Sequence, residues 1–389
     1  MTEEQPEEHK EVVPLFRDPA IAPSLRYGLP VVLLITLGLY LGADIGSGVA
    51  AVTRIIPDPR DTFSQPEDET LLTVSVFTSV SELWKTGSYA LAILIVLTSI
   101  VWPYVKLLGA LYAWFFCVRE RFLVFFDALG KWSFVDVIVF LQIVVVFRST
   151  IPLGGPFLEV WMVPKWGLYA FICASMMNLL GTHVILYQWR RLRLEHPPSE
   201  VKGLQISSAT RWGASLSTLI GGVLYFSGWF ISVYRILNSR AGTDLPAESY
   251  ALVDIGTDLP DAAKDTVEGG LRYLQIVWFV LGLVMPLLST LSTLALLWAP
   301  LSVEVLRKVF FATEIFFAWS CSEVLFVSTV FAVLEIPKFG DGLIDSGCET
   351  CYVVDSELLV EIVVLGLGTV FSTVGTVVAF VRARSSLYT

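Results

Sequence analysis

The chain has 389 residues, of which 55% are hydrophobic and 16% are charged. A soluble domain of this length carries fewer apolar and more ionic side chains, so the surplus apolar residues are expected to face lipid. The formal net charge of -10 argues against a nucleic-acid partner. Composition and charge therefore predict an integral membrane protein.

Eight stretches of the chain are long and apolar enough to cross a bilayer. A hydrocarbon core of about 30 Å takes about 20 apolar residues per helix. We therefore predict an all-α membrane protein with about eight transmembrane helices. The predicted spans are residues 29–52, 89–117, 134–151, 166–189, 212–234, 273–298, 315–336 and 358–381.

The distribution of Lys and Arg predicts the orientation, because basic residues that flank spans stay on the cytoplasmic side. The densest basic cluster follows the fourth span and comprises Arg190, Arg191 and Arg193. Residues 119–131, taken as a turn between the second and third spans, are also basic. Both segments are expected in the cytoplasm, together with the N- and C-termini.

Acidic residues mark the segments expected on the other side. They concentrate in two connections, residues 56–88 and 238–270. Residues 1–26 are acidic as well, but they lack the order of a signal peptide and are interpreted as a cytoplasmic tail.

One pattern, Trp-Ser-x-x-acid-Val, occurs twice, starting at Trp132 and at Trp319. The second and sixth predicted spans each contain a proline, Pro103 and Pro286. Matches at a nearly constant offset indicate an internal repeat.

The repeat predicts two four-helix units, residues 27–192 and 212–389, joined by a cytoplasmic linker at 193–211. An even number of spans keeps both units in the same orientation, which predicts parallel repeats about an axis along the membrane normal. Superposing them is expected to bring Trp132 onto Trp319.

Charged side chains inside predicted spans are costly to bury and are functional candidates for that reason. Lys106 and Asp136 lie on adjacent spans and are expected to form a pair, which serves either as a latch between helices or as a titratable, substrate-facing site. Glu323 has no evident basic partner in its own half, which favours a protonated carboxyl or a side chain that reaches the interface. Asp44, in the outer half of the first span, is a weaker candidate. The predicted polar core for transport comprises Lys106, Asp136, Glu323, Ser133, Ser320 and Ser289.

Three segments of the first half resemble the paraquat-inducible protein A family. They are Gly130-Lys131-Trp132-Ser133-Phe134-Val135-Asp136-Val137, the span that runs from Leu97 to Leu107, and the stretch from Ser75 to Trp84 that ends Glu-Leu-Trp. The resemblance weakens in the second half. There, Ser289 stands where Lys106 stands in the first half, and Glu323 replaces the aspartate.

The resemblance implies an integral membrane partner of lipid-transporting MCE proteins, which moves or loads lipid through a groove between helices. Bacterial members typically carry Cys-x-x-Cys zinc ribbons ahead of the spans, and no such pairs precede residues 29 or 212. A structural zinc site needs about four ligands. We therefore expect neither a metal nor another cofactor.

The cysteines and the missing motifs complete the expectations. Cys348 and Cys351 form Cys-Glu-Thr-Cys in the last extracytoplasmic loop and are expected to form a disulfide in an oxidising compartment. The sequence has no P-loop, no Gly-x-Ser-x-Gly elbow and no His-Glu-x-x-His motif, and His183 and His196 are isolated. An enzyme is therefore not predicted.

The preferred hypothesis is a membrane component of a lipid or hydrophobic-compound transport system. One alternative is a secondary transporter of a small polar solute, which requires a central aqueous cavity. Another is a structural, tetraspan-like protein, in which the intramembrane charges tolerate neutral replacement.

Overall fold

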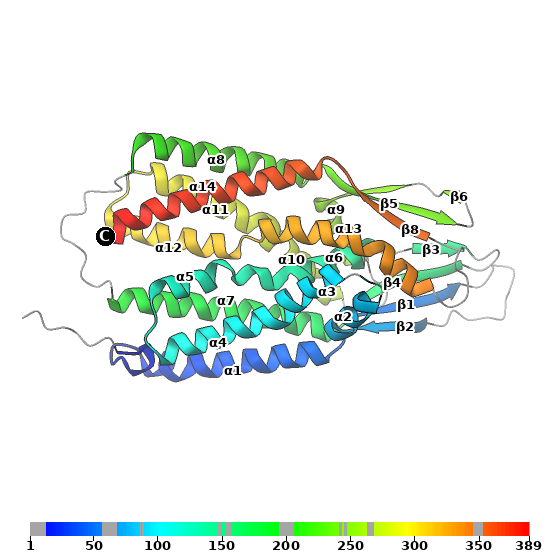
Figure 1. The fold of residues 1–389 in the computed structure, drawn as a ribbon, viewed down its shortest axis with the longest axis horizontal. Helices are drawn as coiled ribbons and strands as arrows, with labels where there is room; N and C mark the ends of the chain where they lie inside the picture. Colours follow the sequence, from blue (N-terminus) through cyan, green and yellow to red (C-terminus); the bar gives the residue numbers. More distant parts are fainter. Residues whose placement is uncertain are drawn as a thin grey trace, which may run out of the picture.

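The computed structural model describes most of the chain, and its helices run side by side in one bundle with strands at one end (Figure 1). The described residues are 13–56, 68–85, 87, 89–146, 149–152, 157–193, 206–240, 243–244, 247–262, 268–344 and 353–388. The C-terminus and the first described residues both lie at the end of the bundle opposite the strands, here named the termini end. The opposite end is named the sheet end.

Seven described helical stretches are long and apolar enough to cross a membrane, in agreement with a nearly all-α membrane protein. Three of them are single helices: α1 (Pro23–Ile45), α7 (Trp166–Arg193) and α14 (Ile362–Tyr388). The fifth predicted span corresponds to α8 (Ser208–Gly228), which is not among these seven; it packs along α14 (Figure 1) and is richer in Gly, Ser and Thr. Large apolar side chains such as Leu219 and Val370 remain exposed on these helices, as contact with lipid requires.

Two spans contain a turn of π-helix just before a proline. The second span runs through α3 (Tyr89–Ile95), η2 (Val96–Val101) and α4 (Trp102–Phe115). The sixth runs through α10 (Glu268–Phe279), η5 (Val280–Val284) and α11 (Met285–Trp298). Pro103 and Pro286 each lack the backbone N–H that would donate to a carbonyl one turn earlier in an α-helix. The π-helical turn of each span lies where this hydrogen bond is missing.

Two other spans are broken, and here the predicted boundaries were wrong. Residues 119–131 are not a simple turn, because α5 (Glu120–Ala128) and the short helix η3 (Gly130–Phe134) lead directly into α6 (Val135–Val146). The seventh span begins earlier than predicted, with α12 (Val303–Trp319), and resumes as α13 (Ser322–Ile344). Both breaks lie well inside the bundle (Figure 1).

The sequence did not predict the strands, which form two sheets at the sheet end. Strands β1 (Val49–Ile56), β2 (Asp68–Val74), β3 (Ser149–Pro152) and β4 (Phe157–Pro164) form one antiparallel sheet in the order β2-β1-β4-β3. In the other, β5 (Ser232–Arg240) pairs with β6 (Thr243–Asp244), β7 (Glu248–Ala251) and β8 (Val353–Leu358). The predicted first, third and fifth spans therefore end too late, because their last residues belong to β1, β3 and β5.

Short helices complete the described chain. The turn η1 (Leu15–Arg17) precedes α1, and α2 (Val76–Lys85) follows β2. At the sheet end of the second half, α9 (Leu252–Asp258) and η4 (Leu259–Asp261) follow β7.

The order of elements recurs in the two halves. In each half a long helix leads into the central strand of a sheet, then come a span with a π-turn and a broken span, and the last helix follows a strand that pairs with the central one. The central strands are β1 and β5, and the strands that pair with them just before the last helix of each half are β4 and β8. The superposition of Trp132 onto Trp319 stays a prediction.

Candidate functional site

The repeated motif marks the two broken spans. In the first half, η3 ends at Phe134 and Asp136 is the second residue of α6. In the second half, α12 ends at Trp319 and Glu323 is the second residue of α13. A carboxylate in the first turn of a helix is favoured by the unpaired backbone N–H groups there. The motif thus places an acidic side chain at the start of each inner helix.

Lys131 and Glu323 form an ion pair between the two breaks. Lys131 Nζ donates to Glu323 Oε2 at 2.6 Å, and their side chains are 4% and 19% exposed. The same ammonium lies 4.2 Å from the centre of the Phe317 ring. Because Lys131 belongs to η3 and Glu323 to α13, the pair joins the first half of the chain to the second.

Two hydroxyl groups complete the shell around Glu323. Thr373 on α14 donates to Oε1 at 2.7 Å, and Ser322 donates to Oε2 at 3.2 Å. Charges in a low-dielectric site need a close counter-ion and further hydrogen bonds to offset their desolvation, and this carboxylate has both. Glu323 has its basic partner in the other half of the chain, which the sequence did not reveal, and this ion pair favours neither of the two alternatives considered for it.

A second polar contact between the halves involves His183 on α7, which the sequence presented as isolated. Its Nδ1 lies 2.6 Å from Asp127 Oδ1, and its Nε2 accepts a hydrogen bond of 2.9 Å from Trp319 Nε1. An indole N–H can only donate, so Trp319 is the donor in this contact. His183 therefore bridges Asp127 of its own half and Trp319 of the second half.

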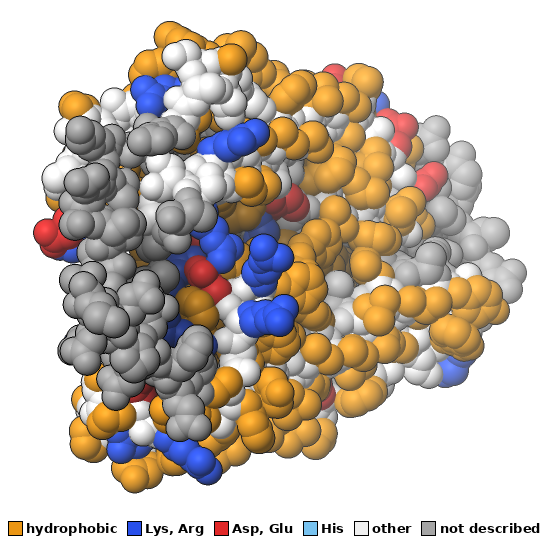
Figure 2. All heavy atoms as spheres, turned by 60° about the vertical axis from the view of Figure 1, so that its left-hand side comes forward, with side chains coloured by type: hydrophobic (Ala, Val, Ile, Leu, Met, Phe, Trp, Pro, Cys, Tyr) orange, Lys and Arg blue, Asp and Glu red, His pale blue; other side chains and the backbone are white. Residues whose placement is uncertain are grey.

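Buried charges also join the halves nearer the termini end. Arg190 on α7 donates to Glu120 on α5 at 2.8 Å and forms a bidentate pair with Glu314 on α12. Arg384 on α14 approaches the second Glu120 oxygen at 2.7 Å. Figure 2, which turns the termini end forward, shows Lys, Arg and acidic side chains around a hollow in this face.

The predicted pair of Lys106 and Asp136 is absent from the ion pairs of the described residues, and each has a different neighbour. Lys106 is buried in α4, its ammonium faces Gly130 of η3, and Asp127 is the charge that acts on it. Asp136 is buried in α6 and hydrogen-bonded to Ser99. The two side chains therefore face different surroundings, although they occupy adjacent spans as expected.

The three predicted serines are all buried, but only one lies close to the ion pair. Ser320, in the break before α13, is 3.4 Å from Ser322, which in turn contacts Glu323. Ser133 lies in η3 and its hydroxyl has no hydrogen-bond partner among the described residues. Ser289 lies in α11, where its carbonyl accepts a hydrogen bond from Ser292.

Sequence reasoning missed Lys131, His183 and Arg190 as site residues. Lys131 stands within the quoted motif, but its position beside a basic segment suggested a cytoplasmic turn. The recurrence of the motif within the predicted seventh span, residues 315–336, was the signal that both copies are internal. Cys348 and Cys351 lie outside the described residues, as does His196.

Comparison with known proteins agrees with the resemblance in the first half. Residues 69–189 match the family model of paraquat-inducible protein A. The match contains Lys106, Lys131 and Asp136, and it stops before Glu323. No curated protein and no solved structure matches the chain. The family match and the seven apolar helices identify an integral multi-pass membrane protein.

Proposed function

We propose that this membrane protein is a component of a lipid or hydrophobic-compound transport system, in which the junction between the two halves moves or loads the lipid. One observation carries the proposal: two broken spans meet inside the bundle at the ion pair of Lys131 and Glu323. Broken helices inside a membrane are tolerated where they line a cavity or are buried in protein, and in transporters they commonly form the substrate site.

The surroundings of the pair suit an amphiphile. The Glu323 side chain remains 19% exposed although its span is apolar. Phe317 lies beside the pair, because the centre of its ring is 4.2 Å from Lys131 Nζ, and it packs edge-on against Phe380 of α14 with 5.5 Å between ring centres. A polar head group and an apolar chain would therefore find complementary surfaces side by side.

The finer parts of the proposal concern orientation, symmetry and partners. Basic residues near the termini end favour a cytoplasmic location for that end under the positive-inside rule. The recurring order of elements favours two parallel repeats that move relative to each other. The family resemblance favours an MCE-type protein as the partner that receives or delivers lipid.

The proposal is tested by purification and reconstitution. We expect lipid, and an MCE-type protein from the native membrane, to co-purify with the chain in mild detergent, as measured by mass spectrometry. Vesicles that contain the purified protein should exchange a fluorescent phospholipid faster than empty vesicles. The proposal is wrong if the protein retains no lipid and the exchange rate equals that of empty vesicles with and without the co-purified partner.

A further inference from the structure

Arginines from both halves gather around one carboxylate near the termini end. Arg190 on α7 and Arg384 on α14 bind the two oxygens of Glu120, and Arg190 also pairs with Glu314. Two more arginines flank Glu120 in the sequence, and two others follow Arg190. These six residues, here named the arginine cluster, are Arg119, Arg121, Arg190, Arg191, Arg193 and Arg384. The cluster therefore brings six positive charges to two carboxylates.

Four members of the arginine cluster are accessible and have no acidic partner. Arg119, Arg121 and Arg191 are exposed, and Arg193 is half-buried with its guanidinium 5.0 Å from the centre of the Trp189 ring. Within the described part of the chain, none of these four arginines forms an ion pair. Retention of basic residues on one side of the membrane explains why arginines flank the spans, but it does not require them to converge on one carboxylate between the halves. Their convergence concentrates positive charge that attracts an anion.

An exposed apolar strip adjoins the arginine cluster on α7. Leu180, Tyr187 and Arg191 are all exposed and lie on one face of this helix, because they are seven and four residues apart. The centre of the Tyr187 ring is 5.5 Å from that of Phe311 on α12, and the Arg190 guanidinium lies 6.0 Å from the same Phe311 ring. The strip therefore follows the seam between α7 and α12, where the two halves meet, and ends at the arginines.

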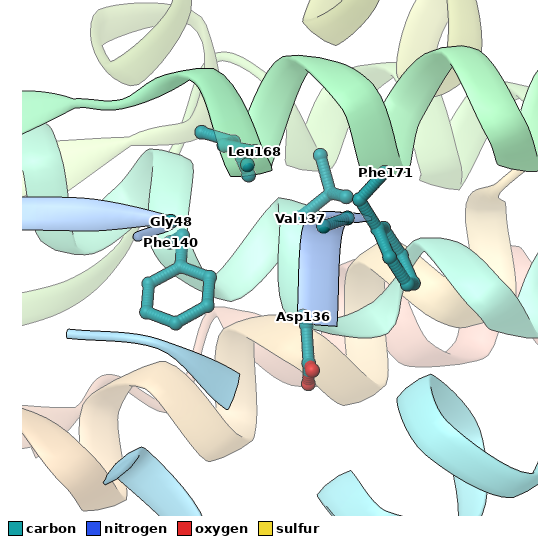
Figure 3. Close-up of a pocket in the computed structure, with 8 residues that line it drawn as sticks. Gly48, Asp136, Val137, Phe140, Leu168 and Phe171 are labelled. Atoms are coloured by element: carbon teal, nitrogen blue, oxygen red, sulfur yellow. The ribbon is translucent and has the colours of Figure 1, made fainter. Parts of the chain in front are cut away.

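We propose that this end of the seam binds an anionic phospholipid, with its phosphate at the arginine cluster and an acyl chain along Leu180 and Tyr187. Guanidinium groups bind phosphate oxygens through paired, charge-assisted hydrogen bonds, and basic pockets between transmembrane helices are typical sites for anionic head groups. The apolar strip favours a lipid over a soluble anion, since only the lipid has a chain that fits it. The pocket beside Asp136 is a different kind of space, because the one charged side chain among the residues that line it is a carboxylate, which repels an anion (Figure 3).

This site consists of residues other than Lys131 and Glu323, and lipid binding can be measured without transport, so the inference does not rest on the proposed function. The purified full chain in dodecyl maltoside is titrated with phosphatidylglycerol, with phosphatidylcholine, or with inorganic phosphate that replaces chloride at constant ionic strength. A ligand that binds only the folded protein raises its unfolding temperature in a saturable way. We expect such a rise with phosphatidylglycerol, and little change with phosphatidylcholine or inorganic phosphate.

Removing charge from the cluster tests whether the arginines hold the lipid. The double variant Arg191→Gln/Arg193→Gln should raise the half-saturating mole fraction of phosphatidylglycerol at least about tenfold, because each arginine near the head groups adds to the attraction of an anionic lipid. Arg190 is kept in every variant, since its ion pairs join the two halves. The control Arg235→Gln/Arg272→Gln removes the same net charge from β5 and from the start of α10, and it should respond like the wild type.

Three outcomes would overturn the inference. The first is that phosphatidylcholine raises the unfolding temperature of the wild type as much as phosphatidylglycerol does, or that neither lipid raises it. The second is that Arg191→Gln/Arg193→Gln keeps the wild-type half-saturating mole fraction. The third is a saturable rise with inorganic phosphate as large as that with phosphatidylglycerol, which would show a site for a soluble anion and not for a lipid.

Discussion

Lys131 and Glu323 meet across the seam between the two halves of the chain, with 2.6 Å between Nζ and Oε2, and each lies beside the break in its own span. Residues 192 positions apart thus share one contact. Such a contact fixes how the two inner helices sit relative to each other. Because the proposed function assigns transport to the same junction, stability and transport have to be measured separately.

Removing one member of the pair should destabilise the protein. We expect Lys131→Met and Glu323→Gln each to lower the free energy of unfolding by about 3–5 kcal/mol, because the remaining charge is left buried without a counter-ion. The double variant should recover most of this loss. Thermal unfolding in detergent measures all three. The exposed pair of Lys308 and Glu304 provides the control, since Lys308→Met and Glu304→Gln should leave stability unchanged.

The histidine that links the halves gives a second prediction. His183→Ala should lower the free energy of unfolding by about 1–3 kcal/mol, because Trp319 Nε1 loses its acceptor and buried Asp127 loses its neighbour. Ser215→Ala removes the acceptor of another tryptophan, Trp298, which is 44% exposed. It should cost less, and equal losses in the two variants would contradict this account of His183.

The arginine network near the termini end gives a third. Arg190→Met should destabilise the protein by about 3–5 kcal/mol, because Glu120 and Glu314 both lose a partner in a buried site. Arg235 on β5 forms a pair with Glu357 on β8 in which both side chains are exposed, and Arg235→Met should cost only about 0–1 kcal/mol. Chemical unfolding measures the loss of stability in both variants. A larger loss in Arg235→Met than in Arg190→Met would refute the argument from burial.

Close packing between α8 and α14 gives a fourth. A Cβ at Gly221 would collide with the backbone at Ser372, whereas a Cβ at Gly213 would meet open space. Gly221→Ala should therefore lower the free energy of unfolding by about 1–3 kcal/mol, because the helices have to move apart. Gly213→Ala, on the same helix, should leave it unchanged or slightly higher. An unfolding scan of the two alanine variants checks the difference, and equal stability would show that the helices do not pack this tightly.

Hydropathy predicted the bundle, because lipid contact demands long apolar helices whatever their partners are. It could not predict where a span breaks. The charge of Lys131 and Arg190 made their segments look like surface turns, although each charge is neutralised by a residue from the other half. The strands were not predicted for a related reason. The apolar residues of β1 and β5 directly continue a predicted span, and only their pairing with other strands distinguishes them from a helix.

The sequence predicted which residues belong to the candidate site, but it did not predict which of them contact one another. Asp136 and Glu323 were recognised because a charge in an apolar span needs an explanation. Their partners were not, because Lys131 pairs with Glu323 and Ser99 with Asp136 through the packing of helices far apart in the sequence. The repeated motif carried the missing information: both copies mark a break, and the two breaks meet.

The most direct test of the central claim is phospholipid exchange by the double variant Lys131→Met/Glu323→Gln in reconstituted vesicles, measured beside the wild type and the double variant Lys308→Met/Glu304→Gln. Removing both charges leaves no unpaired ion, so the fold is kept while the polar junction is lost. The account predicts folded protein with exchange reduced to near the rate of empty vesicles, and wild-type exchange in the exposed-pair control. Wild-type exchange in the Lys131 and Glu323 double variant would contradict it and would make the pair a structural latch.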